Sequence, residues 1–268
     1  MLRQNKKDLI SVIIPAFKQE KTIGADLRRI KNVLEHLNYE YEIIVVVDGT
    51  TDKTLENAKK VSSKKIKVLG YEKNKGKGYA VRYGMVRAKG TIIGFLDAGM
   101  ELNPNGLAIL LEKFQELDAD VIIGSKRHEL SKVHYPFVRR ATSVASQILI
   151  RALFGLSVRD TQVGMKFFKK KVIEDVLPRL LVKKFAFDIE ILVVAYYLGY
   201  KKIYDAPVEL TFDFEGSLVS KNLAKAIFNT LWDTLAIFYR LKILHYYSDG
   251  NRRRWRFDSD LNFPVNLP

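Results

Sequence analysis

Two apolar segments of this chain each end on an aspartate. Residues 42–47, EIIVVV, run into Asp48, and residues 91–96, TIIGFL, run into Asp97. Continuous apolar segments of this length are typical of strands in a parallel sheet that helices cover on both faces. Such sheets bind their ligands just beyond the carboxyl ends of the strands. Carboxylates at two strand ends therefore predict a site at that edge, suited to a ribose, a base or a metal ion.

The first half of the chain alternates short apolar runs with helical stripes, in which apolar residues recur every three or four positions. Strands are predicted at 9–14, 42–47, 65–69, 91–96 and 121–124, and helices at 22–37, from Asp52, at 79–88 and from Pro104 to Leu117. This alternation predicts an α/β fold with a mostly parallel central sheet flanked by helices.

Two further helices are predicted in the second half, at 140–154 and from Ser220 to about residue 244. Both are expected to be amphipathic. The apolar face of the second is predicted to consist of Leu223, Ile227, Leu231, Leu235 and Phe238. Amphipathic helices pack on their own domain or lie in a bilayer interface.

The composition limits the class of protein. The chain has 268 residues, 47% of them hydrophobic, and no cysteine, which excludes disulfides and a thiolate nucleophile. Its first eight residues have no apolar core and do not resemble a signal peptide. No apolar stretch approaches the ~20 residues that span a bilayer. We therefore expect a cytoplasmic location.

The net charge points to anionic partners. Lysine and arginine number 45 against 30 acidic residues, which gives a formal charge of +15. Such a field attracts nucleic acid, phosphorylated small molecules or an acidic membrane face. Nucleic acid is not the expected partner, because the strand-end aspartates would repel its phosphates.

A loop rich in lysine and glycine, NKGKG at 74–78, lies between the third strand and the next helix. Glycine lets a backbone approach a ligand closely, and lysines at a helix N-terminus attract phosphate. The chain has neither a Gly-x-Gly-x-x-Gly turn after the first strand nor a P-loop, so it is not expected to be a dinucleotide-binding Rossmann protein or a P-loop NTPase.

These segments together resemble the family-2 inverting glycosyltransferases, which have the GT-A nucleotide-diphospho-sugar transferase fold. The resemblance rests on PAFKQE at 15–20, DGTTDKT at 48–54 and DAG at 97–99. A narrower likeness, to the polyprenyl-phosphate sugar synthases, rests on KGKG at 75–78, GSK at 124–126, DTQVGMKFF at 160–168, FAFDIE at 185–190 and EGS at 215–217. Among these synthases the dolichyl-phosphate glucose type is more similar than the mannose type. The likeness covers residues 9 to about 245.

The resemblance implies a hexosyltransferase that moves a sugar, with inversion, from a UDP-glucose-type or GDP-mannose-type donor to a polyprenyl (dolichyl or undecaprenyl) phosphate. It implies a peripheral location on the inner face of a membrane, with an anionic membrane surface as partner. A membrane-protein partner or a homo-oligomer is also open. The implied division is a catalytic domain at 1–215, with a nucleotide half at 9–125 and an acceptor half at 126–215, then a C-terminal helix and tail at 216–268.

The resemblance also assigns roles by position. The residues that would hold the base, ribose and diphosphate are Pro15, Phe17, Glu20, Asp48, Lys77 and Asp97. The residues that would line the acceptor side are Lys126, Arg139, Arg140, Gln162 and Lys166, and Asp160 would hold their loop. Asp97 and Glu101 would bind Mg²⁺ or Mn²⁺.

Three positions depart from the family pattern. Val47 replaces the first aspartate of Asp-Asp-Gly, Gly99 replaces the second carboxylate of Asp-x-Asp, and Leu218 stands where a lysine often follows Gly-Ser. Gly99 leaves fewer oxygen ligands, since Mg²⁺ rests on one or two carboxylates plus substrate phosphates. A weak metal requirement is therefore expected.

Two alternatives remain. One is a glycosyltransferase that acts on a hydroxyl of a cell-surface glycan, for which Asp188 or Glu190 would be the base. The other is a catalytically weakened homologue.

Overall fold

The computed structural model describes residues 8–131, 137–210, 223–250, 255–259 and 261–266, without the side chains of 137–142, 223–227, 255, 263 and 266. The central sheet contains β1 (Leu9–Ala16), β2 (Glu40–Asp48), β3 (Ile66–Tyr71), β4 (Ile92–Leu96), β5 (Val121–Ser125), β6 (Met165–Lys169) and β7 (Ile203–Pro207). The helices are α1 (Ile23–Glu35), α2 (Thr54–Lys59), α3 (Lys77–Met85), α4 (Gly106–Glu116), α5 (Phe137–Phe154), α6 (Lys170–Val176), α7 (Phe187–Tyr197) and α8 (Leu223–Phe238). Short helical turns follow α6 (Leu177–Arg179) and α8 (Tyr239–Ile243).

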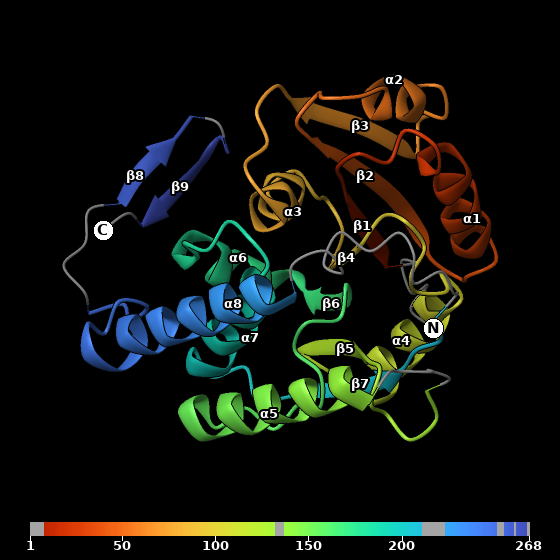
Figure 1. The fold of residues 1–268 in the computed structure, drawn as a ribbon. Coiled ribbons are helices and arrows are strands. Elements are labelled where there is room, and N and C mark those ends of the chain that lie inside the picture. The colour runs from red at the N-terminus through yellow and green to blue at the C-terminus, as the bar shows by residue number, and fades with distance from the viewer. Residues whose placement is uncertain (1–7, 132–136, 211–222, 251–254, 260, 267–268) are drawn as a thin grey trace, which may run out of the picture.

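The predicted mostly parallel sheet is confirmed (Figure 1). Its strand order is β3-β2-β1-β4-β6-β5-β7, and only β6 runs antiparallel to its neighbours. All five strands predicted in the first half are present, and each predicted helix matches an observed one. β6 separates β4 from β5, which are consecutive in the sequence.

The sheet has one apolar core on each face, because side chains alternate along each strand. In β1, Val12 and Ile14 face a core formed with α1, α2 and α4, whereas Ile13 faces a core formed with α3, α6 and α7. Figure 1 shows the same arrangement around β1 to β3, with α1 and α2 outside the sheet and α3 on its other side.

The C-terminal segment packs on the rest of the α/β fold. Ile237 of α8 and the following Tyr246 and Tyr247 are buried in the core that contains α7. A hairpin, β8 (Trp255–Asp258) and β9 (Phe263–Asn266), places Leu261 and Val265 against Tyr79 of α3. The boundary predicted at 215/216 lies outside the described residues. Within the described part of the chain, no helix combines the length and apolar character needed to cross a membrane.

The apolar face predicted for α8 is only partly covered. Its Leu231 and Leu235 are 41% and 43% exposed, whereas Thr234 and Ile237, outside the predicted face, are buried. The helix is apolar on more than one side, so its sequence pattern did not determine which side would pack.

Candidate active site

The carboxylate of Asp48 holds the loop that begins α3. Its Oδ1 accepts a hydrogen bond from Lys75 N at 2.7 Å, and its Oδ2 accepts from Gly76 N and Asn74 Nδ2, each at 2.9 Å. Gly76 has φ +100°, and a Cβ there would lie 2.4 Å from the Lys183 carbonyl oxygen. Asp48 therefore shapes this loop through its own carboxylate, and the nucleotide contact predicted for it stays a prediction.

Lys77 follows at the first position of α3 and points to two carboxylates. Its Nζ lies 2.8 Å from Asp97 Oδ2 and 2.9 Å from Asp188 Oδ2. Burial alone would lower the pKa of Lys77, but Asp188 and Asp97 outweigh it and raise that pKa. The side chain is therefore a cation at neutral pH, at the carboxyl edge of the sheet where a diphosphate is expected.

Asp97 directly follows β4, and one of its carboxylate oxygens makes no hydrogen bond within the described residues. Its backbone N donates to the Gly164 carbonyl at 2.9 Å, and its Oδ1 is buried without a hydrogen-bond partner among the described residues. Burial raises the pKa of the Asp97 carboxyl, while Lys77 acts against this shift. An unpartnered buried oxygen is costly, so a ligand at this position would relieve the cost.

Asp188 joins Lys77 to a second, fully buried lysine. Lys166 of β6 is 0% exposed, and its Nζ donates to Asp188 Oδ1 at 2.5 Å and to the Val163 carbonyl oxygen. Burial would raise the pKa of Asp188, but Lys166 and Lys77 outweigh it and lower that pKa. Asp188 is thus ionised, and each of its oxygens is held by a lysine ammonium, which does not suit a general base.

Glu190, the other candidate base, also has hydrogen bonds to both of its carboxylate oxygens. Its Oε2 accepts from Leu181 N and Val182 N at 3.0 and 2.8 Å, and its Oε1 accepts from Tyr247 Oη at 2.7 Å and Arg240 Nη1 at 3.3 Å. The side chain is fully buried. Its observed role is to join α7, the preceding loop and the segment after α8.

A divalent metal fits this site only in part. Within the described residues, no three histidine, aspartate or glutamate side chains gather as a metal site, and the Glu101 side chain is exposed. The free Asp97 Oδ1 offers one ligand, and Mg²⁺ can complete its shell with substrate phosphates and water. Asp97 would hold such an ion, which would stabilise the charge of a departing diphosphate.

The turn after Asp97 depends on Asp26, which the sequence reasoning missed. Asp26 Oδ2 accepts a hydrogen bond from Gly99 N at 3.2 Å, and Gly99 has φ +96°. Asp26 is buried on α1 beside Ile23 and Leu27. An acidic residue on the apolar stripe of a predicted helix was the available signal.

The predicted base-binding residues lie at the end of β1 and in the turn that follows it. Pro15 is the penultimate residue of β1, and Phe17 is half-buried beside the Lys18 ammonium, 5.3 Å from its ring centroid. Glu20 Oε2 accepts from Lys53 N at 3.1 Å, so the turn is tied to the start of α2.

The residues predicted on the acceptor side differ in burial, and their roles stay predictions. Lys166 is fully buried and donates to Asp188. Gln162 is exposed, and its N donates to Asp160 Oδ1 at 3.2 Å, while Lys126 is half-buried. Arg139 and Arg140 belong to α5, but their side chains lie outside the description, as does Leu218.

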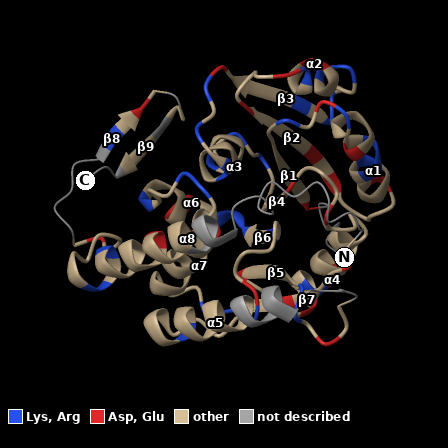
Figure 2. Cartoon of the chain, in the orientation of Figure 1, with Lys and Arg blue, Asp and Glu red and all other residues tan. Residues whose placement is uncertain are grey.

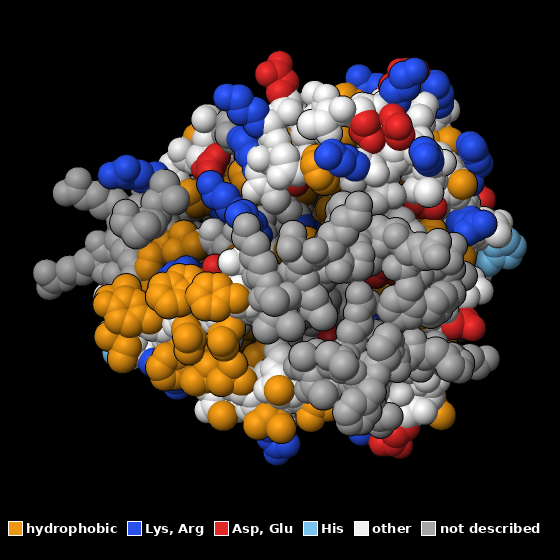
Figure 3. Space-filling model, in the orientation of Figure 1, with side chains coloured by type: hydrophobic (Ala, Val, Ile, Leu, Met, Phe, Trp, Pro, Cys, Tyr) orange, Lys and Arg blue, Asp and Glu red, His pale blue; other side chains and the backbone are white. Residues whose placement is uncertain are grey.

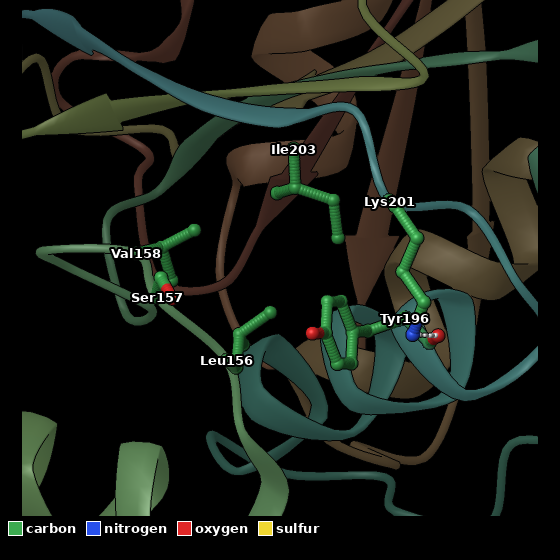
Figure 4. Close-up of a pocket in the computed structure, with 6 residues that line it drawn as sticks. All are labelled: Leu156, Ser157, Val158, Tyr196, Lys201 and Ile203. Atoms are coloured by element: carbon green, nitrogen blue, oxygen red, sulfur yellow. Dashed lines mark hydrogen bonds between the residues drawn. The ribbon is translucent and has the colours of Figure 1, made fainter.

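A cavity of about 400 Å³ lies elsewhere (Figure 4). Leu156, Ser157, Val158, Tyr196, Lys201 and Ile203 line it. Lys201 Nζ donates to the Tyr196 carbonyl at 2.6 Å. Ile203 pairs with Val121 at the amino-terminal end of β5, whereas Asp97 follows the carboxyl end of β4. The cavity is therefore at the opposite edge of the sheet.

Known proteins share this sequence pattern. Residues 11–177 match the model of glycosyl transferase family 2. A dolichyl-phosphate beta-glucosyltransferase of Trichomonas vaginalis is 30% identical over 87% of this chain and 75% of its own length. One of Drosophila melanogaster is 33% identical over 69% and 62%, and a dolichol-phosphate mannosyltransferase of Pyrococcus furiosus is 32% identical over 83% and 61%. The chain thus spans between about three fifths and three quarters of these relatives.

Solved structures share the fold. The glucosyl-3-phosphoglycerate synthase of Mycobacterium tuberculosis, in complex with Mn²⁺, UDP and phosphoglyceric acid, has a TM-score of 0.66 and 19% identity over 97% of this chain and 88% of that one. The mannosyl-3-phosphoglycerate synthase of Rubrobacter xylanophilus has a TM-score of 0.68 and 16% identity over 88% and 75%. The sheet and its helices have the GT-A arrangement, and the chain belongs to glycosyl transferase family 2.

Proposed function

We propose that this protein transfers a hexose from a nucleotide-diphosphate sugar to a polyprenyl phosphate. The relatives that are 30% or more identical are named dolichyl-phosphate glucosyltransferases and dolichol-phosphate mannosyltransferase, which supports a polyprenyl phosphate as acceptor. UDP-glucose or GDP-mannose would be the donor type. Lys77 and a metal ion on Asp97 would stabilise the negative charge of the departing diphosphate.

One observation carries the choice of acceptor. The two acids predicted as a base for a hydroxyl acceptor, Asp188 and Glu190, are buried, and both oxygens of each already accept hydrogen bonds. A hydroxyl acceptor needs such a base. A phosphate monoester has a second pKa of about 6 and is already largely ionised at neutral pH, so it needs cations for positioning and no base.

The test is the transfer of radiolabelled sugar. With polyprenyl phosphate supplied, label should pass from the nucleotide donor to an organic-extractable product, and Asp97→Ala should abolish transfer in a folded protein. Arg139→Ala with Arg140→Ala should raise the acceptor KM more than the donor KM. Label that passes instead to a saccharide hydroxyl would favour the other acceptor class, and no transfer to either would favour a weakened homologue.

The acceptor is a lipid, so we propose an anionic membrane surface as partner. α8 and the first residue of the helical turn after it present an exposed apolar stripe at helical spacing. Its members Phe228, Leu231, Trp232, Leu235 and Tyr239 are 64%, 41%, 65%, 43% and 52% exposed. Figure 3 shows hydrophobic side chains gathered over this helix. Aromatic residues with polar tips favour the membrane interface.

The charge of the chain suits the same partner. The formal charge of +15 would draw the protein to acidic lipids. Figure 2 shows basic and acidic residues together on several helices, among them α1, α2 and α4. Attraction would therefore come from the whole molecule, and the stripe would supply the local contact.

Vesicle co-sedimentation tests this surface. Binding should need anionic lipid, weaken with salt, and be lost in Trp232→Ser with Leu235→Ser. Phe257→Ser is the matched control, because Phe257 is 66% exposed on β8, outside the stripe. If the stripe variants instead abolish a concentration-dependent dimer and leave vesicle binding unchanged, the stripe contacts a second copy.

A further inference from the structure

The carboxylate of Asp188 pairs with two lysines that differ in burial and in their other partners. Lys166 is 0% exposed, and Asp188 and the Val163 carbonyl enclose its ammonium. The Lys77 side chain is 14% exposed and is shared between Asp188 and Asp97. Lys166 is therefore a fixed partner, whereas Lys77 lies next to the position expected for the substrate.

The surroundings of these charges are apolar on one side. The Lys77 and Lys166 nitrogens lie 5.2 and 5.1 Å from the centroid of the Phe95 ring, and Phe95 is fully buried. Electrostatic interactions are strong where water is excluded, and an unpaired charge is correspondingly costly. The two lysines and two aspartates together are neutral.

We propose that Asp188 is a positioning residue for Lys77 and that Lys166 serves as the permanent counter-ion of Asp188. With Lys166 in place, the Lys77 ammonium can turn to a diphosphate without leaving Asp188 as an unpaired buried carboxylate. Asp188 itself touches neither the donor nor the acceptor. This inference rests on the proposed function, because it assumes that Lys77 meets the diphosphate.

The decisive variant removes both members of the buried pair. Asp188→Asn alone would remove the carboxylate that pairs with the buried Lys166, and Lys166→Met alone would leave Lys77 to balance both Asp97 and Asp188. Either single variant leaves one charge of the cluster uncompensated and is expected to destabilise the protein strongly. Asp188→Asn with Lys166→Met removes one charge of each sign, and Met keeps the unbranched stem of Lys. The matched control is Asp118→Asn with Lys169→Met, an exposed pair 2.8 Å apart that also involves β6.

The double variant should unfold at the denaturant concentration of the wild type, while its kcat falls about 100-fold, because an ångström of misplacement can cost that much. Its donor KM should change by less than about threefold, since the lost interaction forms mainly in the transition state. The control pair should change neither quantity. If the double variant has both the stability and the kcat of the wild type, Asp188 only balances the charge of Lys166, and the inference is refuted.

A second measurement shows whether Asp188 acts through Lys77. In a Lys77→Met background, in which Asp188 keeps Lys166 as its partner, adding the two substitutions should lower kcat no further. A further 100-fold loss there would contradict the inference.

The binding of UDP and GDP separates this inference from the proposed function. Either nucleoside diphosphate carries the full charge of the leaving group, so its Kd should rise equally in Lys77→Met and in the double variant. Unequal changes refute the role of Asp188 even in an active enzyme. An absence of sugar transfer by the wild type refutes the proposed function, and the Kd comparison still stands.

Discussion

Gly164 is the position where a single methyl group should do most harm to the active site. A Cβ on Gly164 would lie 2.0 Å from Asp97 Oδ2 and 2.3 Å from Asp97 Cγ. Ordinary contacts begin at 3.4 Å, so the Asp97 carboxylate would have to move by about 1.4 Å in Gly164→Ala. A displacement of that size breaks the 2.8 Å contact between Asp97 Oδ2 and Lys77 Nζ.

Two effects of different size follow from this displacement. Overpacking of a buried position costs about 1–3 kcal/mol in the free energy of unfolding. Misplacement of a catalytic carboxylate by more than 1 Å should lower kcat about 100-fold. We therefore expect Gly164→Ala to fold with a moderately lower denaturation midpoint and to lose nearly all activity.

Gly24→Ala is the control. Gly24 lies in α1, where a Cβ would meet only the Arg28 guanidinium at 3.6 Å. Alanine should raise the free energy of unfolding there by about 0.5–1 kcal/mol, because glycine costs entropy in a helix. Chemical denaturation and sugar transfer are measured on both variants. A Gly164→Ala protein with wild-type kcat would refute the placement of Asp97 in the reaction.

Three further predictions concern charged groups. Gly99→Asp adds a carboxylate near Asp97 and should tighten Mn²⁺ binding, measured by titration. The φ of +96° at this position should lower the free energy of unfolding by about 1–3 kcal/mol. Unchanged Mn²⁺ affinity would contradict a metal on Asp97. Burial raises the pKa of Asp205 in β7 from 3.8 to about 6, so the free energy of unfolding of the wild type should fall as the pH rises through this interval. Asp205→Asn should remove this pH dependence and raise the free energy of unfolding by up to about 3 kcal/mol above pH 6, which denaturation at several pH values measures. Glu190→Gln places an amide NH₂ against hydrogen-bond donors, so unfolding should require about 1–3 kcal/mol less with little change in kcat; a large loss of kcat at wild-type stability would restore Glu190 as a base.

The sequence predicted the helices and strands whose formation follows from the pattern of neighbouring residues. The strands before Asp48 and Asp97 are continuous apolar runs, and the early helices have clear stripes. β6, MKFFK, and β7, IYDAP, were not predicted, since they are short and contain charged residues or proline. These segments form strands because they pair with strands that are distant in the sequence, and the spacing of apolar residues within a segment gives no information on such pairing.

The same limit applies to the site. The strand-end aspartates were located because their position follows from the sheet. The contacts of Asp188 with Lys77 and with Lys166 join three separate segments of the chain. Nothing local in the sequence shows that Lys166 is buried beside Asp188, and the acceptor-side role that the resemblance assigns to Lys166 stays a prediction. Electrostatic partners of this kind become known only with the tertiary structure.

The position of β6 has a consequence for how the protein folds. β4 and β5 follow one another in the sequence but cannot pair, because residues 165–169 must first enter between them. Until β6 arrives, both strands have an unpaired edge, which is open to association with other chains. Contacts of long sequence separation form slowly, so insertion of β6 is expected to be a late step, with the greatest risk of aggregation just before it. Because β6 carries Lys166, the buried charges of the active site would become paired only when the sheet closes.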